Sequence, residues 1–237
     1  MNLLTSEIET KIDPFKEPIY YSTEVARLVK ITPARVIRWL KGYKYFYSDQ
    51  IVSKPPVVPQ RKELSKPEND ASFYDLIELL FVKQFLDYGI SLQKLRKAFD
   101  EAKRILGIPH LAHQVFFTDG KNICLKVKNK GDAILELLSG GQWVIHDIIV
   151  QLAYQIDFDT VTQEARRWYP PEGNRLVILD PLYSFGQPII KDRGIRTEII
   201  YDLYLSEGKK IDVVCKWYNL SQKEVNAAIN FQSKITA

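Results

Sequence analysis

Long apolar runs are missing from this chain, and cysteine is scarce. No apolar stretch approaches the roughly 20 residues that a membrane-spanning helix needs, and residues 1–18 are acidic and lack the apolar core of a secretory signal. The two cysteines, Cys124 and Cys215, stand far apart in apolar surroundings, which is typical of reduced core residues. These absences exclude membrane proteins and disulfide-stapled secreted domains, and they predict a cytoplasmic protein.

Residues with catalytic or metal-binding spacing are equally scarce. The three histidines are His110, His113 and His146. No cysteine or acidic residue accompanies them at the spacing of zinc ligands, and Ser139-Gly140-Gly141 lacks the Lys-Ser/Thr that follows a phosphate-binding loop. Asp157 and Asp159 lie on an apparent strand, where such a pair is more often solvated than bound to a metal. Because no set of nucleophile, base and orienting residue stands out, we expect no cofactor, no metal and no enzymatic activity.

What the chain does contain is one short pattern near each end. Residues 21–40 predict a short helix, a tight turn closed by Thr32, and a second short helix. Residues 210–231 repeat this pattern, with Ser221 and Glu224 spaced as a capping box. Both segments therefore predict helix-turn-helix units.

The two units differ in charge. Residues 20–66 carry ten lysines and arginines against three acidic residues, a local balance of +7. Residues 181–237 carry eight basic and six acidic residues, a balance of +2. Positive charge concentrated on one small unit indicates phosphate binding, although a solvated basic surface is the alternative.

The second helix of the first unit predicts a DNA-reading face. Thr32 caps it, and Val36, Ile37 and Leu40 cluster on one side, which leaves the arginines on the other. Such a face can enter the major groove, where arginine contacts guanine. The predicted DNA-binding residues are Thr32, Arg35, Arg38, Trp39, Lys41 and Lys44, together with Arg61 and Lys62 from a wing or linker over 48–70 in which Val57-Val58 could form an edge strand.

Two longer helices follow this linker. The first covers residues 71–88, and Ser91 caps the second. Apolar residues of the second helix recur at spacings of 3 and 4, as in a coiled-coil seam. This seam comprises Leu92, Leu95, Phe99, Ala102 and Leu106. It fits both a dimerising helix pair and one side of an intramolecular hairpin, and both interpretations remain open.

The middle region, 107–180, predicts mixed α and β structure without a functional pattern. Asp119-Gly120 marks a β-hairpin over 114–127, and residues 132–138 and 145–152 suggest short helices. Short strands are expected at 156–158, 166–168 and 176–179.

The C-terminal helices predict a nearly neutral outer surface. Val225, Ala228 and Ile229 form the expected buried side of the last helix, and its outward residues lack arginine. Nearby aromatic residues are of the kind enriched at protein interfaces, although they also suit a core. The predicted partner-binding residues are Tyr201, Tyr204, Trp217, Tyr218, Gln222 and Asn226.

Two stretches resemble known families. Ser22–Leu28 and Gly89–Arg96 resemble MerR-like winged helix-turn-helix proteins, although Val36–Gly42 is shorter before its glycine than the family pattern. Phe185–Lys191, Ile195–Glu198, Val213–Leu220 and Val225–Ile229 look like a small domain, formerly of unknown function, that occurs in Vap-type antitoxins. The combination resembles VapB-type antitoxins, whose members are commonly encoded beside PIN-like ribonuclease toxins.

The expected architecture is mainly α with small β elements. A polar leader (1–19) precedes a MerR-like winged helix-turn-helix and helical hairpin (20–106), an α+β middle (107–180) and a three-helix antitoxin-like domain (181–237). The resemblance implies an antitoxin that neutralises a PIN-like ribonuclease and represses its operon by binding operator DNA. We expect it to act as a homodimer and not to associate with a membrane. A MerR-like transcription regulator without a toxin partner is the second interpretation, and an enzyme is the third.

Overall fold

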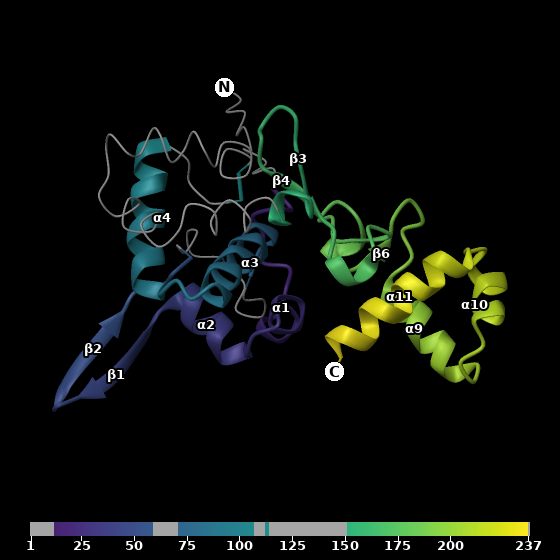
Figure 1. The fold of residues 1–237 in the computed structure, drawn as a ribbon, viewed down its shortest axis with the longest axis horizontal. Helices are drawn as coiled ribbons and strands as arrows, with labels where there is room; N and C mark the ends of the chain where they lie inside the picture. The colour runs from purple at the N-terminus through teal and green to yellow at the C-terminus, as the bar shows by residue number, and fades with distance from the viewer. Residues whose placement is uncertain (1–11, 59–70, 107–111, 114–150, 237) are drawn as a thin grey trace, which may run out of the picture.

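The structure is a computed structural model that describes residues 12–58, 71–106, 112–113 and 151–236. These residues form a mainly helical protein with three small two-stranded sheets, as expected (Figure 1). Several predicted features lie outside the described residues: the 114–127 hairpin, the 132–138 helix, the Gly140-Gly141 pair, His110, His146 and Cys124. None of the described helices is long and apolar enough to cross a membrane.

The N-terminal unit is a helix pair followed by a hairpin. Helices α1 (Ser22–Val29) and α2 (Pro33–Lys41) are joined by a turn in which Lys30 is left-handed. The Thr32 hydroxyl accepts a hydrogen bond from the Arg35 N–H at 3.3 Å, which confirms the predicted cap. We call residues 20–58 the head.

The wing strands lie earlier than the sequence suggested. Strands β1 (Tyr43–Tyr47) and β2 (Gln50–Lys54) pair antiparallel around a two-residue turn with positive φ at both positions, as type I′ hairpins require. The proposed strand at Val57-Val58 is wrong. Both valines are buried, and their N–H groups donate to the Trp39 carbonyl at 2.7 and 3.1 Å, which ties the end of the hairpin to α2.

Glycine is required where α2 turns into the wing. Gly42 has φ +72°, and a Cβ there would overlap the carbonyl of Lys54 on the returning strand. Only a residue without a side chain permits this close approach between the end of α2 and the base of the hairpin.

Helix α3 (Phe73–Asp87) is the central core element, and α4 (Leu92–Leu106) packs against it. Ser72 and Asp75 form a capping box at the start of α3. All of its first ten residues are buried, because α1, α2 and β4 (Ala165–Trp168) all contact it. This central position explains why α3 carries apolar residues on all of its sides.

The chain then builds two small sheets and three helices. Strand β3 (Ile156–Phe158) pairs with β4, and β5 (Val177–Ile178) pairs with β6 (Ile189–Ile190). The short strands predicted at 156–158, 166–168 and 176–179 are therefore confirmed to within a residue or two. Single 3-10 turns, η1 (Pro171–Gly173) and η2 (Ser184–Gly186), lie between strands.

Helices α9 (Thr197–Ser206), α10 (Ile211–Tyr218) and α11 (Gln222–Ile235) form the C-terminal three-helix unit, visible at one end of the molecule (Figure 1). The predicted capping box is present. The Ser221 hydroxyl accepts from the Glu224 N–H at 3.3 Å, and the Glu224 carboxylate accepts from the Ser221 N–H at 2.7 Å. We call residues 177–236 the tail.

A buried ion pair connects β4 to the tail. The Arg167 Nε and Nη2 atoms donate to one oxygen of Asp180 at 3.0 and 2.9 Å, and the Leu182 N–H donates to the other at 3.0 Å. The Asp180 side chain is fully buried, whereas that of Arg167 retains some exposure. Burial lowers the pKa of Arg167, but hydrogen bonds to Tyr169 and Asp180 outweigh it, so this pKa lies above its usual value.

We expect Asp180→Asn to destabilise the protein by roughly 2–3 kcal/mol, because Arg167 would lose the nearer and more buried of its two carboxylate partners. Urea denaturation followed by circular dichroism measures this loss. Asp159→Asn is the matched control, since Asp159 is only partly buried and accepts hydrogen bonds from its own turn, and a cost as large as that of Asp180→Asn would contradict the prediction.

Candidate functional site

Helix α2 presents an exposed basic face away from the core. Arg35 and Arg38 are both exposed, as predicted, while Val36 and Leu40 are buried on the opposite side. Thr32, at the start of the helix, is also exposed. The helix therefore offers its arginines to a ligand without giving up its packing against α1 and α3.

Two assignments on α2 are corrected. Trp39 was predicted beside the arginines, but it is only 3% exposed and belongs to the core, whereas Ile37, predicted to be buried, is 39% exposed. The buried side is Val36, Trp39 and Leu40, at spacings of 3 and 1. The indole is the larger apolar surface, so the helix is rotated to cover it rather than Ile37.

The wing continues the exposed surface with a row of tyrosines that the sequence analysis missed. Tyr43, Tyr45 and Tyr47 alternate along β1 and therefore share one side of the hairpin. The Arg38 guanidinium lies 5.3 Å from the centre of the Tyr43 ring, and that ring is 6.0 Å from Tyr45. Lys54 lies directly across from Tyr43 in the hairpin register.

The Tyr-x-Tyr-x-Tyr alternation followed by Ser-Asp was the available signal for this strand. We call the combined surface the basic-aromatic surface, and it consists of Arg35, Arg38, Lys41, Tyr43, Tyr45, Tyr47 and Lys54. Lys44 is exposed on the other side of the hairpin, and Arg61 and Lys62 lie outside the described residues.

The predicted dimer seam is partly described. Leu95 is 0% exposed within a single chain, and Leu92 is half-buried. The side chains of Phe99, Ala102 and Leu106 lie outside the described set, although their backbone belongs to α4. Burial of Leu95 against the same chain favours the intramolecular interpretation at that position, and the dimer stays a prediction.

The tail places its predicted partner-binding residues on three helices. Trp217, at the end of α10, is 70% exposed, whereas Tyr201, Tyr204 and Tyr218 are half-buried. Gln222 is exposed and donates to Asp212 at 3.1 Å, and Asn226 is exposed on α11. Trp217 is therefore the open aromatic anchor of the group.

A second exposed apolar group in the tail was not anticipated. Leu182 and Tyr183 precede a left-handed turn that contains Phe185, and Phe185 is 82% exposed. Ser184, Phe185 and Gly186 have φ values of 48°, 53° and 74°. Left-handed conformations are unfavourable for residues with side chains, so tertiary contacts must hold this turn.

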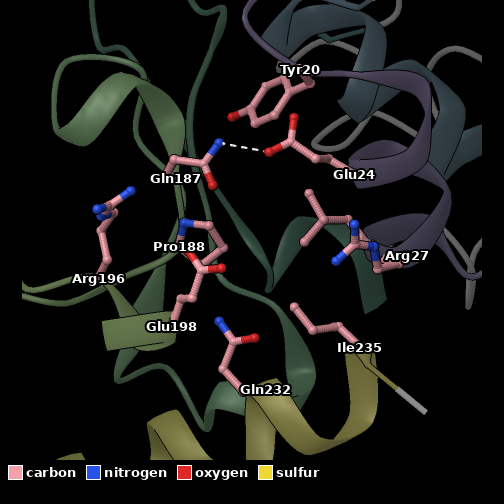
Figure 2. Close-up of a pocket in the computed structure, with 10 residues that line it drawn as sticks. Tyr20, Glu24, Arg27, Gln187, Pro188, Arg196, Glu198, Gln232 and Ile235 are labelled. Carbon is pink, nitrogen blue, oxygen red and sulfur yellow. Dashed lines mark hydrogen bonds between the residues drawn. The ribbon is translucent and has the colours of Figure 1, made fainter. Parts of the chain in front are cut away.

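Those contacts join the tail to the head. The Tyr20 hydroxyl, just before α1, donates to the Gly186 carbonyl at 2.9 Å in a buried hydrogen bond. Gln187 donates to Glu24 at 3.1 Å (Figure 2). Burial, with the nearby charges of Glu24 and Asp180, raises the pKa of Tyr20 above its usual value. A Cβ at Gly186 would overlap the Tyr20 hydroxyl, so a side chain is excluded there.

Other residues considered for chemistry have structural roles in the described part of the chain. Asp157 accepts from Tyr169 at 2.7 Å and lies near Arg167 and Arg175. Burial raises the pKa of the Cys215 thiol, which disfavours a reactive thiolate. Among the described residues, no group of three or more His, Cys, Asp and Glu is placed to hold a metal ion.

Comparison with known proteins shows what this chain is similar to. Residues 177–231 match the family described as "Protein of unknown function (DUF433)". Over 94% of this chain and 96% of the relative, the sequence is 22% identical to a protein of Mycobacterium tuberculosis named "Putative antitoxin VapB45". The predicted resemblance to a VapB-type antitoxin with a C-terminal domain of unknown function is thereby confirmed.

A shorter sequence match and a structural match were also found. Over 75 residues, 31% of each chain, the sequence is 37% identical to the "Uncharacterized HTH-type transcriptional regulator" proteins Mb1861 of Mycobacterium bovis and Rv1830 of M. tuberculosis. The crystal structure of Rv2018 from M. tuberculosis matches with a TM-score of 0.72 and 22% identity, over 91% of this chain and 99% of that one. The structural match supports the fold alone.

The ion pair between Lys30 and Glu172 predicts a pH dependence of stability. It joins the α1–α2 turn to η1, with the Glu172 carboxylate mostly buried. Burial raises the pKa of Glu172, but the hydrogen bond and charge of Lys30 outweigh it, so the pKa lies below its usual value. The resulting stabilisation is complete above the unfolded-state pKa of about 4.3 and is lost as pH falls through the lower folded-state pKa.

We therefore expect wild type to be more stable than Lys30→Gln by about 0.5–1 kcal/mol near pH 6, with the difference shrinking towards pH 3 or so. Urea titrations across this range measure it. Lys223→Gln, at an exposed position of α11, should show no such pH-dependent difference, and a pH-independent gap for Lys30→Gln would contradict the assignment.

Proposed function

We propose that this protein is a non-enzymatic antitoxin that binds a PIN-like ribonuclease through its tail and represses its own operon through its head. The observation that carries the proposal is the division of surfaces between two helix-turn-helix units of one chain. The head unit exposes arginines and tyrosines, and the tail unit exposes Trp217 with neutral polar residues. Relatedness over almost the whole chain to a protein named as an antitoxin supports it.

The head is suited to operator DNA. In a MerR-like winged helix-turn-helix, α2 would enter the major groove, where Arg35 and Arg38 can make bidentate contacts to guanine. The tyrosine row and Lys54 continue from Arg38 along the wing, so they would lie along the sugar-phosphate backbone beside the groove. Phenol hydroxyls donate hydrogen bonds to phosphate without adding charge, whereas the lysines also displace counterions.

The tail is suited to a protein partner. Trp217 offers a large apolar ring at the end of α10, and the same three-helix unit exposes polar side chains such as Gln222. A central aromatic residue within a polar rim is the usual composition of a protein interface. Binding there would cover the ribonuclease, while the nearly neutral charge of the tail leaves little attraction for phosphate.

We further propose a homodimer that reads a palindromic operator, because paired helix-turn-helix units gain affinity by contacting two half-sites. The second half of α4 is the candidate contact. Leu95 is already used inside the chain, so the contact would involve residues beyond it. Sedimentation at tens of micromolar tests the dimer, and a monomer would remove it from the proposal.

A transcription regulator without a toxin partner is the second candidate function. The 37% identity to proteins named as HTH-type regulators favours it. The two functions share the head and differ in the tail. The antitoxin function predicts that a neighbouring gene encodes a small nuclease and that this nuclease co-purifies with the protein. Both findings together would favour the antitoxin over the regulator.

Replacing Arg35 or Arg38 with alanine should weaken binding to the DNA upstream of its own gene by roughly 1–3 kcal/mol each. Neither change should unfold the protein, because both side chains are exposed. A gel-shift series at several salt concentrations measures the effect. Arg166→Ala, an exposed arginine on β4, is the matched control.

The same series includes Tyr45→Phe, which removes a hydroxyl and no charge. It should lower affinity a few-fold without changing the slope of log K against log salt, whereas Lys54→Gln should reduce the slope by about one. Unchanged affinity in both arginine variants would remove α2 from the groove.

Replacing Trp217 with alanine should abolish co-purification of the neighbouring gene product, since loss of a central aromatic residue costs about 2 kcal/mol or more. DNA binding should be unchanged. Tyr154→Ala removes another exposed aromatic side chain outside the tail and should leave co-purification intact. Retention of the partner by Trp217→Ala, with wild-type affinity, would place the toxin contact elsewhere.

A further inference from the structure

The junction of head and tail forms a cavity of about 150 Å³ that is open to solvent. It lies between α1 of the head and the start of α9 and end of α11 in the tail (Figure 2). At about 30 Å³ per water molecule, it has room for roughly five waters or one small metabolite. Sites for small ligands occur preferentially at such interfaces between structural units.

Opposite charges face this cavity from opposite sides. Arg27, in the last turn of α1, points in from the head, and Glu198, in the first turn of α9, points in from the tail (Figure 2). In the described parts of the chain, neither side chain forms an ion pair. An arginine and a glutamate held apart across a cavity can each bind a complementary charge on one ligand.

The rest of the cavity lining includes apolar, uncharged polar and charged groups. Leu28, Pro188 and Ile235 supply apolar surface, and the buried Gln232 supplies an amide whose Nε2 donates to Thr197 at 2.8 Å. The hydrogen bond between Gln187 and Glu24 closes one side, and Arg196 also lines the cavity from the tail (Figure 2). The charged groups open to a ligand are therefore Arg27 from the head and both Glu198 and Arg196 from the tail.

We propose that this cavity binds a small zwitterion of the amino-acid type. Its carboxylate pairs with Arg27, its ammonium group pairs with Glu198, and a short apolar side chain contacts Leu28 and Ile235. Because Arg27 belongs to the head and Glu198 to the tail, the ligand links the two units and stabilises their contact. This assignment is independent of the proposed roles in DNA and toxin binding.

Isothermal titration of the full chain with L-leucine tests the proposal, and we expect saturable binding with a Kd of about 1 mM or tighter. N-acetyl-leucine lacks the ammonium charge and leucinamide lacks the carboxylate, so each should bind about tenfold more weakly or not at all. Glu198→Gln should lose the preference for leucine over N-acetyl-leucine, and Arg27→Gln should lose the preference over leucinamide.

Asp202→Asn and Arg166→Gln are matched controls, since both positions are exposed and neither lines the cavity. They should bind leucine as wild type does. Hydrogen exchange should slow on leucine addition in residues 20–28 and 187–198 together. Absence of saturable binding by wild type, or equal binding by the Arg27→Gln/Glu198→Gln double variant, would overturn the assignment whatever the DNA and toxin experiments show.

Discussion

The arrangement of this protein depends on one buried hydrogen bond, between the Tyr20 hydroxyl and the Gly186 carbonyl. The two residues are 166 positions apart in sequence. A buried phenol without a partner is costly, and a carbonyl reaches it only because the chain at Ser184–Gly186 takes a left-handed turn. The same turn leaves Phe185 exposed, brings Gln187 to Glu24, and sets α1 against the tail, where the cavity forms.

Helix α2 is amphipathic, so one of its sides packs in the core while the other stays in solvent. One side, with Val36, Trp39 and Leu40, joins the core, and the Trp39 carbonyl holds the chain that returns from the wing. The other side keeps Arg35 and Arg38 in solvent. Because the wing is fastened to the buried side of the helix, its tyrosines continue the exposed side. The exposed surface of helix plus hairpin is thus built on packing that does not involve Arg35 or Arg38.

The two helix-turn-helix units show how similar local structure can serve different chemistry. Thr32 and Ser221 cap the second helix of each unit in the same way, through a hydroxyl that accepts from the third helical N–H. The two helices differ in their exposed side chains. The head unit carries arginines and the tail unit carries Gln222 and Asn226. The fold of each unit therefore does not assign its ligand, and the exposed side chains do.

Local features of the chain were determined by the sequence itself: the caps at Thr32 and Ser221, the extent of α3, and the strands at 156–158 and 165–168. These depend on residues within about four positions of one another, which the sequence displays directly. The tertiary structure decided the rest. Whether Trp39 or Ile37 would be covered depended on the packing of α1, α3 and the returning wing, since both border the apolar side of α2. The contact of Tyr20 with Gly186, and the facing of Arg27 and Glu198, join segments more than 150 residues apart. No local pattern encodes such contacts, because they exist only once the core between them has formed.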